Sequence, residues 1–293
     1  MRLDFVHTGK DAIWTYGIEK GYFKDAGIDL TLQDGKGSAT TGQTVGNGSD
    51  KIGLVDSGTL ITLAAKGVPV KAIASVFAQS PLAVLSPEQK PINTPQDLVG
   101  KKVAITSGDG PSTLLPALLA KNGIDPGQLT TVNLQPQAKL TSLLSGNVDA
   151  VATITLVQAT LQAQSLKTHA MLYNAVGVKT PGYYLMTSNG YVASNKDLIQ
   201  KFVTATQKSL KATTDDPNAA IASFIKAYPD YKKDTATAEL NLLLPLIPDP
   251  DASHPLGWMS PELATSTGEL LKQYGGLSDP KPVNDYLTNE FIK

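Results

Sequence analysis

Small polar residues and glycines gather where apolar runs of the sequence end. His7 to Lys10 (HTGK) follows the first apolar run, and Asp56 to Thr59 (DSGT) follows a later one. Ser107 to Thr113 (SGDGPST) and Thr153 to Thr155 stand in similar places farther along. Each set precedes a segment with helical periodicity, whose first N–H groups have no partner within the helix. Such sets can hold a ligand by hydrogen bonds.

The same residue types also serve as ordinary helix caps. A Ser, Asp or Thr before a helix stabilises it by about 1 kcal/mol without any ligand. A binding interpretation therefore needs two such sets that face a common space.

The stretch DGKGSATTGQT, from Asp34 to Thr44, only partly matches a phosphate-binding loop. Gly37 and Gly42 have the required spacing and Thr44 takes the last place, but Gln43 stands where the lysine belongs. We interpret the stretch as a recognition loop whose glycines allow close backbone approach and whose Ser38 and Thr40 add hydroxyl groups.

Catalytic patterns are missing from the sequence. It has no cysteine and three histidines, His7, His169 and His254, and no G-x-S-x-G motif supplies an exposed serine beside them. No histidines and carboxylates have metal-ligand spacing. We expect a binding protein that is not an enzyme and uses no cofactor and no metal.

The composition excludes some partners. The 293 residues carry a net charge of −1, so no basic field favours nucleic acid or an anionic membrane surface. Arg2 is the single arginine, so a bound anion would depend on lysine, hydroxyl groups or backbone N–H groups. No apolar run is long enough for a membrane span, and we expect either a cytosolic protein or one whose export signal has been removed.

Strands and helices alternate over the first half of the chain, which predicts mostly parallel sheets. The pattern occurs twice. Registering Asp50 on Asp149 brings GNGSDKIGLVDSGTLITLAAK onto LSGNVDAVATITLVQATLQAQ. The expected strands are 3–7, 28–32, 51–55, 70–76, 102–106, 131–134 and 148–154; the expected helices are 11–23, 59–66, 112–122, 139–145 and 156–165. From Ser194 onward only helices are expected, at 195–213, 217–227, 234–244, 261–274 and 283–291.

Several of these segments together resemble one family. GYFKDAGI, LAAKGVPVKAIA and the pattern P-x-DL-x-GKKV, within a stretch from about Phe5 to Ala150, are similar to the substrate-binding proteins of ABC importers. The resemblance is to the branch related to binders of thiamine-pyrimidine precursors and aliphatic sulfonates.

The resemblance implies an α/β, bilobed type II periplasmic-binding-protein fold. Two mostly parallel α/β lobes would be joined by a two-strand hinge, and a helical C-terminal tail would follow. We expect lobe I at 1–79 and 184–293 and lobe II at 80–183. The implied protein is a monomeric, periplasmic or otherwise extracytoplasmic binder that presents a small molecule to an ABC permease.

Fourteen residues are the candidate ligand contacts. Lobe I is expected to supply most of them, lobe II to supply four, and two aromatic residues to form walls. They are His7, Lys10, Trp14, Ser38, Thr40, Asp56, Ser57 and Gln79 from lobe I; Asp109, Ser112, Thr113 and Thr155 from lobe II; and Tyr183 and Trp258 as walls.

The ligand class stays open between alternatives. Trp14, Tyr183 and Trp258 with the Asp56 carboxylate favour a neutral or cationic planar compound with N–H donors, such as a pyrimidine. An organic anion such as a sulfonate or carboxylate is the alternative, although Asp56 and Asp109 would repel it if both face the cleft. A thiamine-pyrimidine biosynthetic enzyme on the same scaffold would need a cysteine-rich motif, which this chain lacks. A sensor domain is a third class.

Overall fold

The chain folds into two compact units. The computed structural model describes residues 1–249 and 253–293. Unit 1 comprises Met1–Gln79, Pro181–Gly268 and Ser278–Lys293, and unit 2 comprises Ser80–Thr180 and Glu269–Leu277. The return to unit 1 thus comes at residue 181, three residues before the expected 184, because Gly182 already hydrogen-bonds to Ser57 and Phe77 of that unit. Part of the helical tail also belongs to unit 2.

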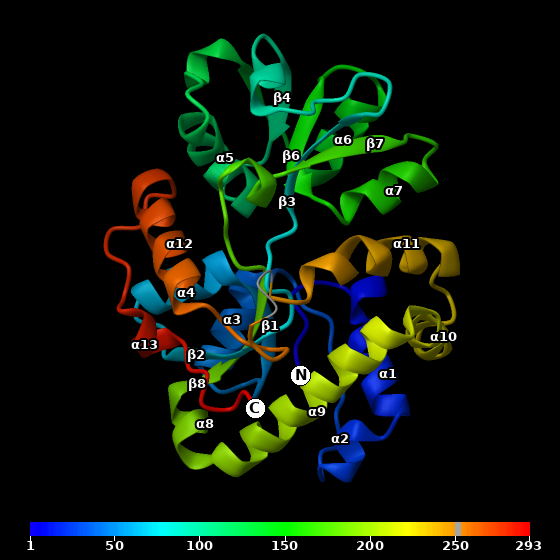
Figure 1. Ribbon diagram of the computed structural model, residues 1–293, viewed down its shortest axis with the longest axis vertical. Coiled ribbons are helices and arrows are strands. Elements are labelled where there is room, and N and C mark those ends of the chain that lie inside the picture. The colour runs from blue at the N-terminus through cyan, green and yellow to red at the C-terminus, as the bar shows by residue number, and fades with distance from the viewer. Residues whose placement is uncertain (250–252) are drawn as a thin grey trace. The chain divides into compact units, whose positions relative to one another are not determined.

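A three-stranded sheet forms the centre of unit 1 (Figure 1). β8 (Tyr183–Ser188) lies between β1 (Gly53–Asp56) and β2 (Val70–Ser75) and runs antiparallel to both. The segments expected as strands 3–7 and 28–32 do not form strands; isolated bridges lie next to them, in which Arg2 pairs with Gln33 and with Gly53. The chain turns away from the sheet after Asp4, so these bridges do not extend into a ladder.

Nearly every residue of β8 is buried, so both faces of this sheet are covered. α1, α9 and α10 lie side by side, and α11 packs on α10 (Figure 1). Their apolar faces form a second core that includes Tyr16, Ile221, Phe224 and Leu240. The helices that begin in unit 1 are η1 (Gly9–Asp11), α1 (Ala12–Glu19), α2 (Tyr22–Asp25), α3 (Ser38–Gly46), α4 (Ser57–Ala65), α8 (Asn189–Ser194), α9 (Lys196–Asp215), α10 (Pro217–Ala227), α11 (Lys233–Leu243), η5 (Leu244–Leu246), α12 (Pro261–Tyr274) and α13 (Val283–Tyr286).

Unit 2 contains a five-stranded sheet in the order β5-β4-β6-β3-β7. β4 is parallel to β5 and β6, whereas β3 is antiparallel to β6 and β7. The strands are β3 (Leu82–Pro87), β4 (Lys102–Ile105), β5 (Thr130–Asn133), β6 (Ala150–Ile154) and β7 (Thr168–Leu172).

The expectation of mostly parallel lobes is therefore wrong, because the sheet of unit 1 is antiparallel and that of unit 2 is mixed. β3 and β8 each follow a point where the chain passes from one unit to the other. Neither strand is reached through a helical crossover within its own unit, which is the connection that parallel pairing requires.

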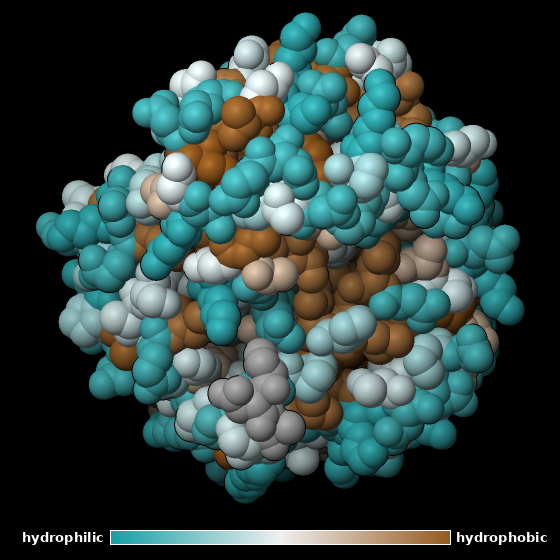
Figure 2. Space-filling model, turned by 45° about the horizontal axis from the view of Figure 1, so that its top comes forward, coloured by the Kyte–Doolittle hydropathy of each residue, from teal (hydrophilic) through white to brown (hydrophobic). Residues whose placement is uncertain are grey.

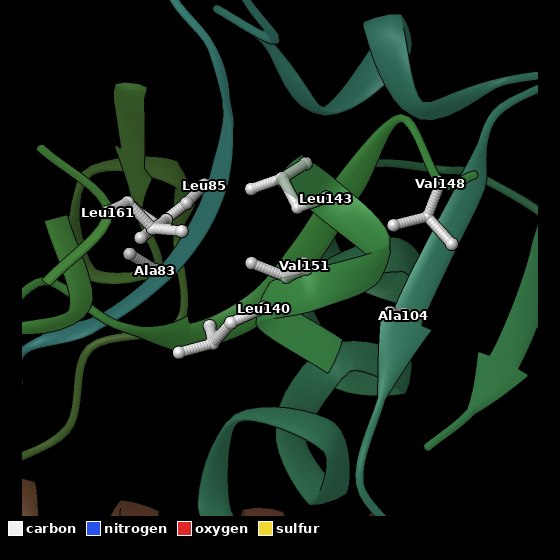
Figure 3. Close-up of a cluster of buried hydrophobic side chains, with 8 residues drawn as sticks. All are labelled: Ala83, Leu85, Ala104, Leu140, Leu143, Val148, Val151 and Leu161. Atoms are coloured by element: carbon white, nitrogen blue, oxygen red, sulfur yellow. The ribbon is translucent and has the colours of Figure 1, made fainter. Parts of the chain in front are cut away.

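The core of unit 2 lies between its sheet and its helices. Leu85, Val151, Leu140, Leu143 and Leu161 point toward one another from β3, β6, α6 and α7 (Figure 3). The helices of this unit are η2 (Pro95–Leu98), α5 (Gly110–Lys121), η3 (Pro126–Gln128), α6 (Pro136–Leu144), α7 (Val157–Ala163) and η4 (Asn174–Val176).

The sequence repeat has a structural counterpart. Asp149 accepts the N–H of Lys102 at 2.8 Å and so joins the beginnings of β6 and β4. Its expected equivalent, Asp50, accepts the Arg2 guanidinium at 3.0 Å beside β1. Each aspartate ties the beginning of one strand to its neighbouring segment.

The surface is mostly hydrophilic on the face shown in Figure 2, with apolar residues gathered in smaller areas. Large apolar side chains that are exposed include Phe5 and Val6 in the loop after Asp4. Within the described residues, no helix combines the length and the apolar character that a bilayer crossing requires.

Candidate functional site

Three expected contacts meet at the carboxyl end of β1. Asp56 caps α4 by accepting the N–H of Thr59 at 2.8 Å, and its own N–H donates to the Ser38 hydroxyl at 3.1 Å. The Ser57 hydroxyl, in contrast, is buried and donates to the carbonyl of Pro181 at 2.8 Å. Ser38 and Asp56 can thus face a ligand, whereas the side chain of Ser57 holds the segment that enters β8.

The loop before α3 has glycines for a reason other than ligand approach. A Cβ on Gly35 would overlap the carbonyl oxygen of Leu3, and Gly37 donates its N–H to the carbonyl of Asp4 at 2.8 Å. Gly37 has φ 106°, a conformation that favours glycine. These glycines fit the loop against the N-terminal segment. Ser38 and the exposed Thr40 then begin α3.

Tyr183 brings a hydroxyl group to the same end of the sheet. It is paired with Asp56 across β8 and β1, and its ring meets Phe77 edge to face at 5.9 Å. Burial raises the pKa of Tyr183, and the carboxylates of Asp4 and Asp56 raise it further. The residue is buried, with 8% of its surface exposed. Tyr183 therefore offers a neutral donor next to acceptors.

Lys10 is buried and already paired. Its Nζ lies 2.9 Å from Asp4 Oδ1 and 2.9 Å from Asp11 Oδ2. Burial lowers the pKa of Lys10, but Asp11 and Asp4 outweigh that effect, so the pKa lies above its usual value and the ammonium stays charged. We do not propose Lys10 as a ligand contact, because Asp4 and Asp11 already pair with its ammonium group.

His7 lies in an aromatic group at the same end of unit 1. Its ring stacks on Tyr228 with centroids 3.8 Å apart, and its Nδ1 lies 3.0 Å from Asp34 Oδ1. Phe224 and Tyr231 surround the stack. One face of His7 is thereby covered, while the half-exposed ring edge stays accessible.

Phe5 and Val6 are candidate contacts that the sequence reasoning missed. Phe5 is 56% exposed and Val6 is 46% exposed, directly after the buried Asp4. Adjacent strand residues point to opposite faces, so two consecutive exposed apolar residues indicate that the strand has ended. The apolar pair before His7 was the signal in the sequence.

The two tryptophans have different surroundings from those expected. Trp14 is 1% exposed in the core, so it offers no free ring face to a ligand. Trp258 is half-buried and stacks on His254 with centroids 4.3 Å apart. His254 in turn lies 2.7 Å from Asp249. One face of Trp258 is therefore covered by the protein itself.

The loop after β4 in unit 2 is tightly bonded. Asp109 caps α5 by accepting the N–H of Ser112 at 2.8 Å, and Ser112 accepts the N–H of Thr106 at 2.9 Å. Lys139 reaches Asp109 Oδ2 at 3.0 Å. Thr113 is half-buried in the first turn of α5.

Thr155 and Gln79 complete the expected set. Thr155 is buried at the end of β6, and its hydroxyl has no hydrogen-bond partner among the described residues. Gln79 is half-buried at the last position before unit 2, and its backbone N–H donates to Leu246 at 3.1 Å. The hydroxyl of Thr155 is therefore both buried and unpaired within the described residues.

His254 lies beside an acid and a serine, as a catalytic histidine would. His254 meets Asp249 and the Ser253 hydroxyl through the same nitrogen, Nδ1, whereas a Ser–His–Asp relay uses both ring nitrogens. In residues 1–249 and 253–293, no three histidine or acidic side chains are grouped as metal ligands.

The fold is that of periplasmic binding proteins. The aliphatic sulphonate binding protein SsuA of Escherichia coli superposes with a TM-score of 0.77 at 16% identity, over 99% of this chain and 92% of that one. The chain belongs to the NMT1/THI5-like family, which it matches over residues 11–220.

Relatives in sequence include a binding protein and an enzyme. The riboflavin-binding protein RibY of Chloroflexus aurantiacus is 25% identical over 286 residues, which cover 93% of this chain and 80% of RibY. A 4-amino-5-hydroxymethyl-2-methylpyrimidine phosphate synthase of Legionella pneumophila is 26% identical over 114 residues, 39% of this chain and 36% of the enzyme. The match that spans nearly the whole chain is to the binding protein.

Proposed function

We propose that this protein is an extracytoplasmic solute-binding protein of an ABC importer. It clamps a small organic molecule between the two units and presents it to a membrane permease as a monomer. The family, the fold and the match to RibY over nearly the full length support this function. A ligand that contacts both units favours the closed state through its differential contacts.

The observation that carries the ligand class is the group of acceptors around Tyr183. Asp56 and Asp4 lie near its hydroxyl, and the cation of Lys10 is paired internally. A ligand with N–H donors matches the partly exposed Asp56 carboxylate, and the exposed ring of Phe5 offers a stacking surface. We therefore favour a neutral or cationic planar heterocycle over an organic anion.

The remaining contacts follow from accessibility and free hydrogen-bonding groups. Ser38, Thr40, His7 and Gln79 add to the surface in unit 1. The backbone and hydroxyl groups of Asp109, Ser112, Thr113 and Thr155 form the surface in unit 2. Trp258 stays a candidate wall through its uncovered face.

Binding is tested by calorimetry on the intact protein with riboflavin, an aminopyrimidine and a short alkanesulfonate. We expect a heterocycle to bind and Tyr183→Phe to weaken that binding about tenfold or more, the value of one hydrogen bond of about 1.5 kcal/mol. Tyr191→Phe in α8 is the matched control, because its ring packs near Lys51 and lies outside the proposed site.

Two results would contradict this proposal. Equal affinity in wild type and Tyr183→Phe would remove Tyr183 from the site. Consumption of the ligand over time by stoichiometric protein would favour the enzymatic alternative, which the Legionella relative represents.

A further inference from the structure

A buried ion pair lies at the loop after β4 in unit 2. Lys139 Nζ is 3.0 Å from Asp109 Oδ2 and donates to the carbonyl of Ala152 at 2.7 Å. The Lys139 side chain is 3% exposed, whereas that of Asp109 is 30% exposed. Asp109 is therefore the member of the pair that meets solvent.

The same carboxylate also occupies the beginning of α5. Asp109 Oδ1 accepts the N–H of Ser112 at 2.8 Å, while Oδ2 faces the lysine. A helix N-terminus and an ammonium group are the two features that attract an anion. One side chain of the protein satisfies both of them.

In unit 1, aspartates likewise pair with a helix N-terminus and with cations. Asp56 caps α4 through Thr59, and Lys10 is held between Asp4 and Asp11. Arg2 is bonded to Asp50, away from the strand ends that carry the proposed contacts. Arg2, Lys10 and Lys139 are thus each paired with an aspartate of their own unit.

We propose that Asp109 is a specificity-determining residue that excludes anionic ligands by keeping Lys139 and the start of α5 occupied. This rests on the proposed function and narrows its ligand to molecules without net negative charge. An anion that approached Asp109 would meet a like charge, and displacing the aspartate would leave it without its buried partner and α5 without its cap.

The test is a gain of anion binding when the carboxylate is removed. Methanesulfonate and sulfate are titrated by calorimetry into wild type, Asp109→Ser and the double variant Asp109→Ser/Lys139→Met. Serine retains a capping hydroxyl and leaves space beside Lys139. We expect at least tenfold tighter anion binding in Asp109→Ser than in wild type, and loss of that gain in the double variant.

A matched control separates this effect from capping alone. Asp216 caps α10 through Ala219 at 3.0 Å, and in the described part of the chain no lysine forms an ion pair with it. Asp216→Ser should gain no anion binding. Asp109→Asn serves if Asp109→Ser does not fold; a smaller gain is expected of it, because the amide removes the like charge but still fills the space beside Lys139.

Two outcomes would overturn the inference. Micromolar binding of methanesulfonate by wild type would show that anions are accepted, although solute binding itself would stand. A folded Asp109→Ser or Asp109→Asn with unchanged anion affinity would show that the Asp109 carboxylate does not exclude anions. Failure of every ligand class to bind wild type would instead count against the proposed function.

Discussion

Tyr183 and Tyr184 are neighbours on β8 whose hydroxyl groups meet different surroundings. Tyr183 points toward the carboxylates at the end of the sheet, and Tyr184 points to the opposite face. Tyr184 is fully buried, and its hydroxyl has no partner among the described residues. Desolvation of an unpaired hydroxyl costs about 1–3 kcal/mol. Adjacent tyrosines on one strand therefore have different roles: Tyr183 is a candidate ligand contact, and the hydroxyl of Tyr184 lowers the stability of the fold.

Tyr184→Phe should stabilise the protein by about 1 kcal/mol, because it removes an unpaired buried hydroxyl and leaves the ring in place. The matched change is Tyr173→Phe, which removes a buried hydroxyl that donates to Pro111 at 2.8 Å. That variant should lose about 1 kcal/mol. Urea unfolding of both variants checks the opposite signs, and equal destabilisation would contradict the assignment of Tyr184 as unpaired.

At the scale of elements, η1 and α11 approach each other closely through Gly9. A Cβ at this position would overlap the carbonyl of Ala236, and the Gly9 N–H donates to Glu239 at 2.7 Å. The contact fixes the loop that carries His7 and Lys10 against the helical tail. A residue without a side chain is required at this point.

Gly9→Ala should cost about 2–3 kcal/mol of stability, because the backbone of α11 has to shift. Gly190 in α8 is the control glycine, since a Cβ there would meet nothing within 4 Å. Gly190→Ala should be neutral or stabilising by up to about 1 kcal/mol. Thermal unfolding compares the two, and a Gly9→Ala variant as stable as wild type would disprove the tight contact.

The sequence predicted the helices better than the strands, since β3, β7 and β8 were not among the expected strands. Helical periodicity placed α5, α10 and α12 within two residues of their observed bounds, because amphipathic spacing is a local property. The last helix was expected over 283–291 but ends at Tyr286. The direction of β3 and β8 depends on how the chain passes between units, which no local pattern encodes.

The candidate site shows the same division. Capping chemistry correctly brought attention to Asp56 and Asp109, which both cap helices. The partners that neutralise Lys10 and Lys139 were missed, since Lys139 lies 30 residues from Asp109 in the sequence. The sequence did not reveal that Trp14 is buried, because an aromatic residue on an amphipathic helix fits both a core and a binding wall.

At the scale of the whole molecule, buried protonated groups in both units link stability to alkaline pH. Burial raises the pKa of Tyr173, Tyr183 and Tyr184, and carboxylates raise that of Lys10 despite its burial. Each group keeps its proton in the folded state at a pH where the unfolded chain has released it. The unfolded state then binds fewer protons, so the free energy of unfolding falls as pH rises.

We expect stability to decline from about pH 10 upward, by as much as about 1.4 kcal/mol per pH unit for each such group. The share of Lys10 is complete below pH 10.5, its usual pKa, and is lost above it. Urea unfolding between pH 8 and 11.5 measures the slope. Lys10→Met should be less stable at neutral pH and show a shallower alkaline slope, and an unchanged slope would contradict the role of Lys10.

β8 lies between β1 and β2, so the sheet of unit 1 cannot form until long after its two outer strands have been synthesised. Both outer strands have been synthesised by residue 75. The strand that pairs with them begins only at Tyr183. Translation of the intervening segment takes roughly 10 s at 5–20 residues per second. The strands of unit 2 up to β7 are made within that interval. The sheet of unit 2 can therefore form before that of unit 1, and until Tyr183 is made the edges of β1 and β2 lack their partner strand.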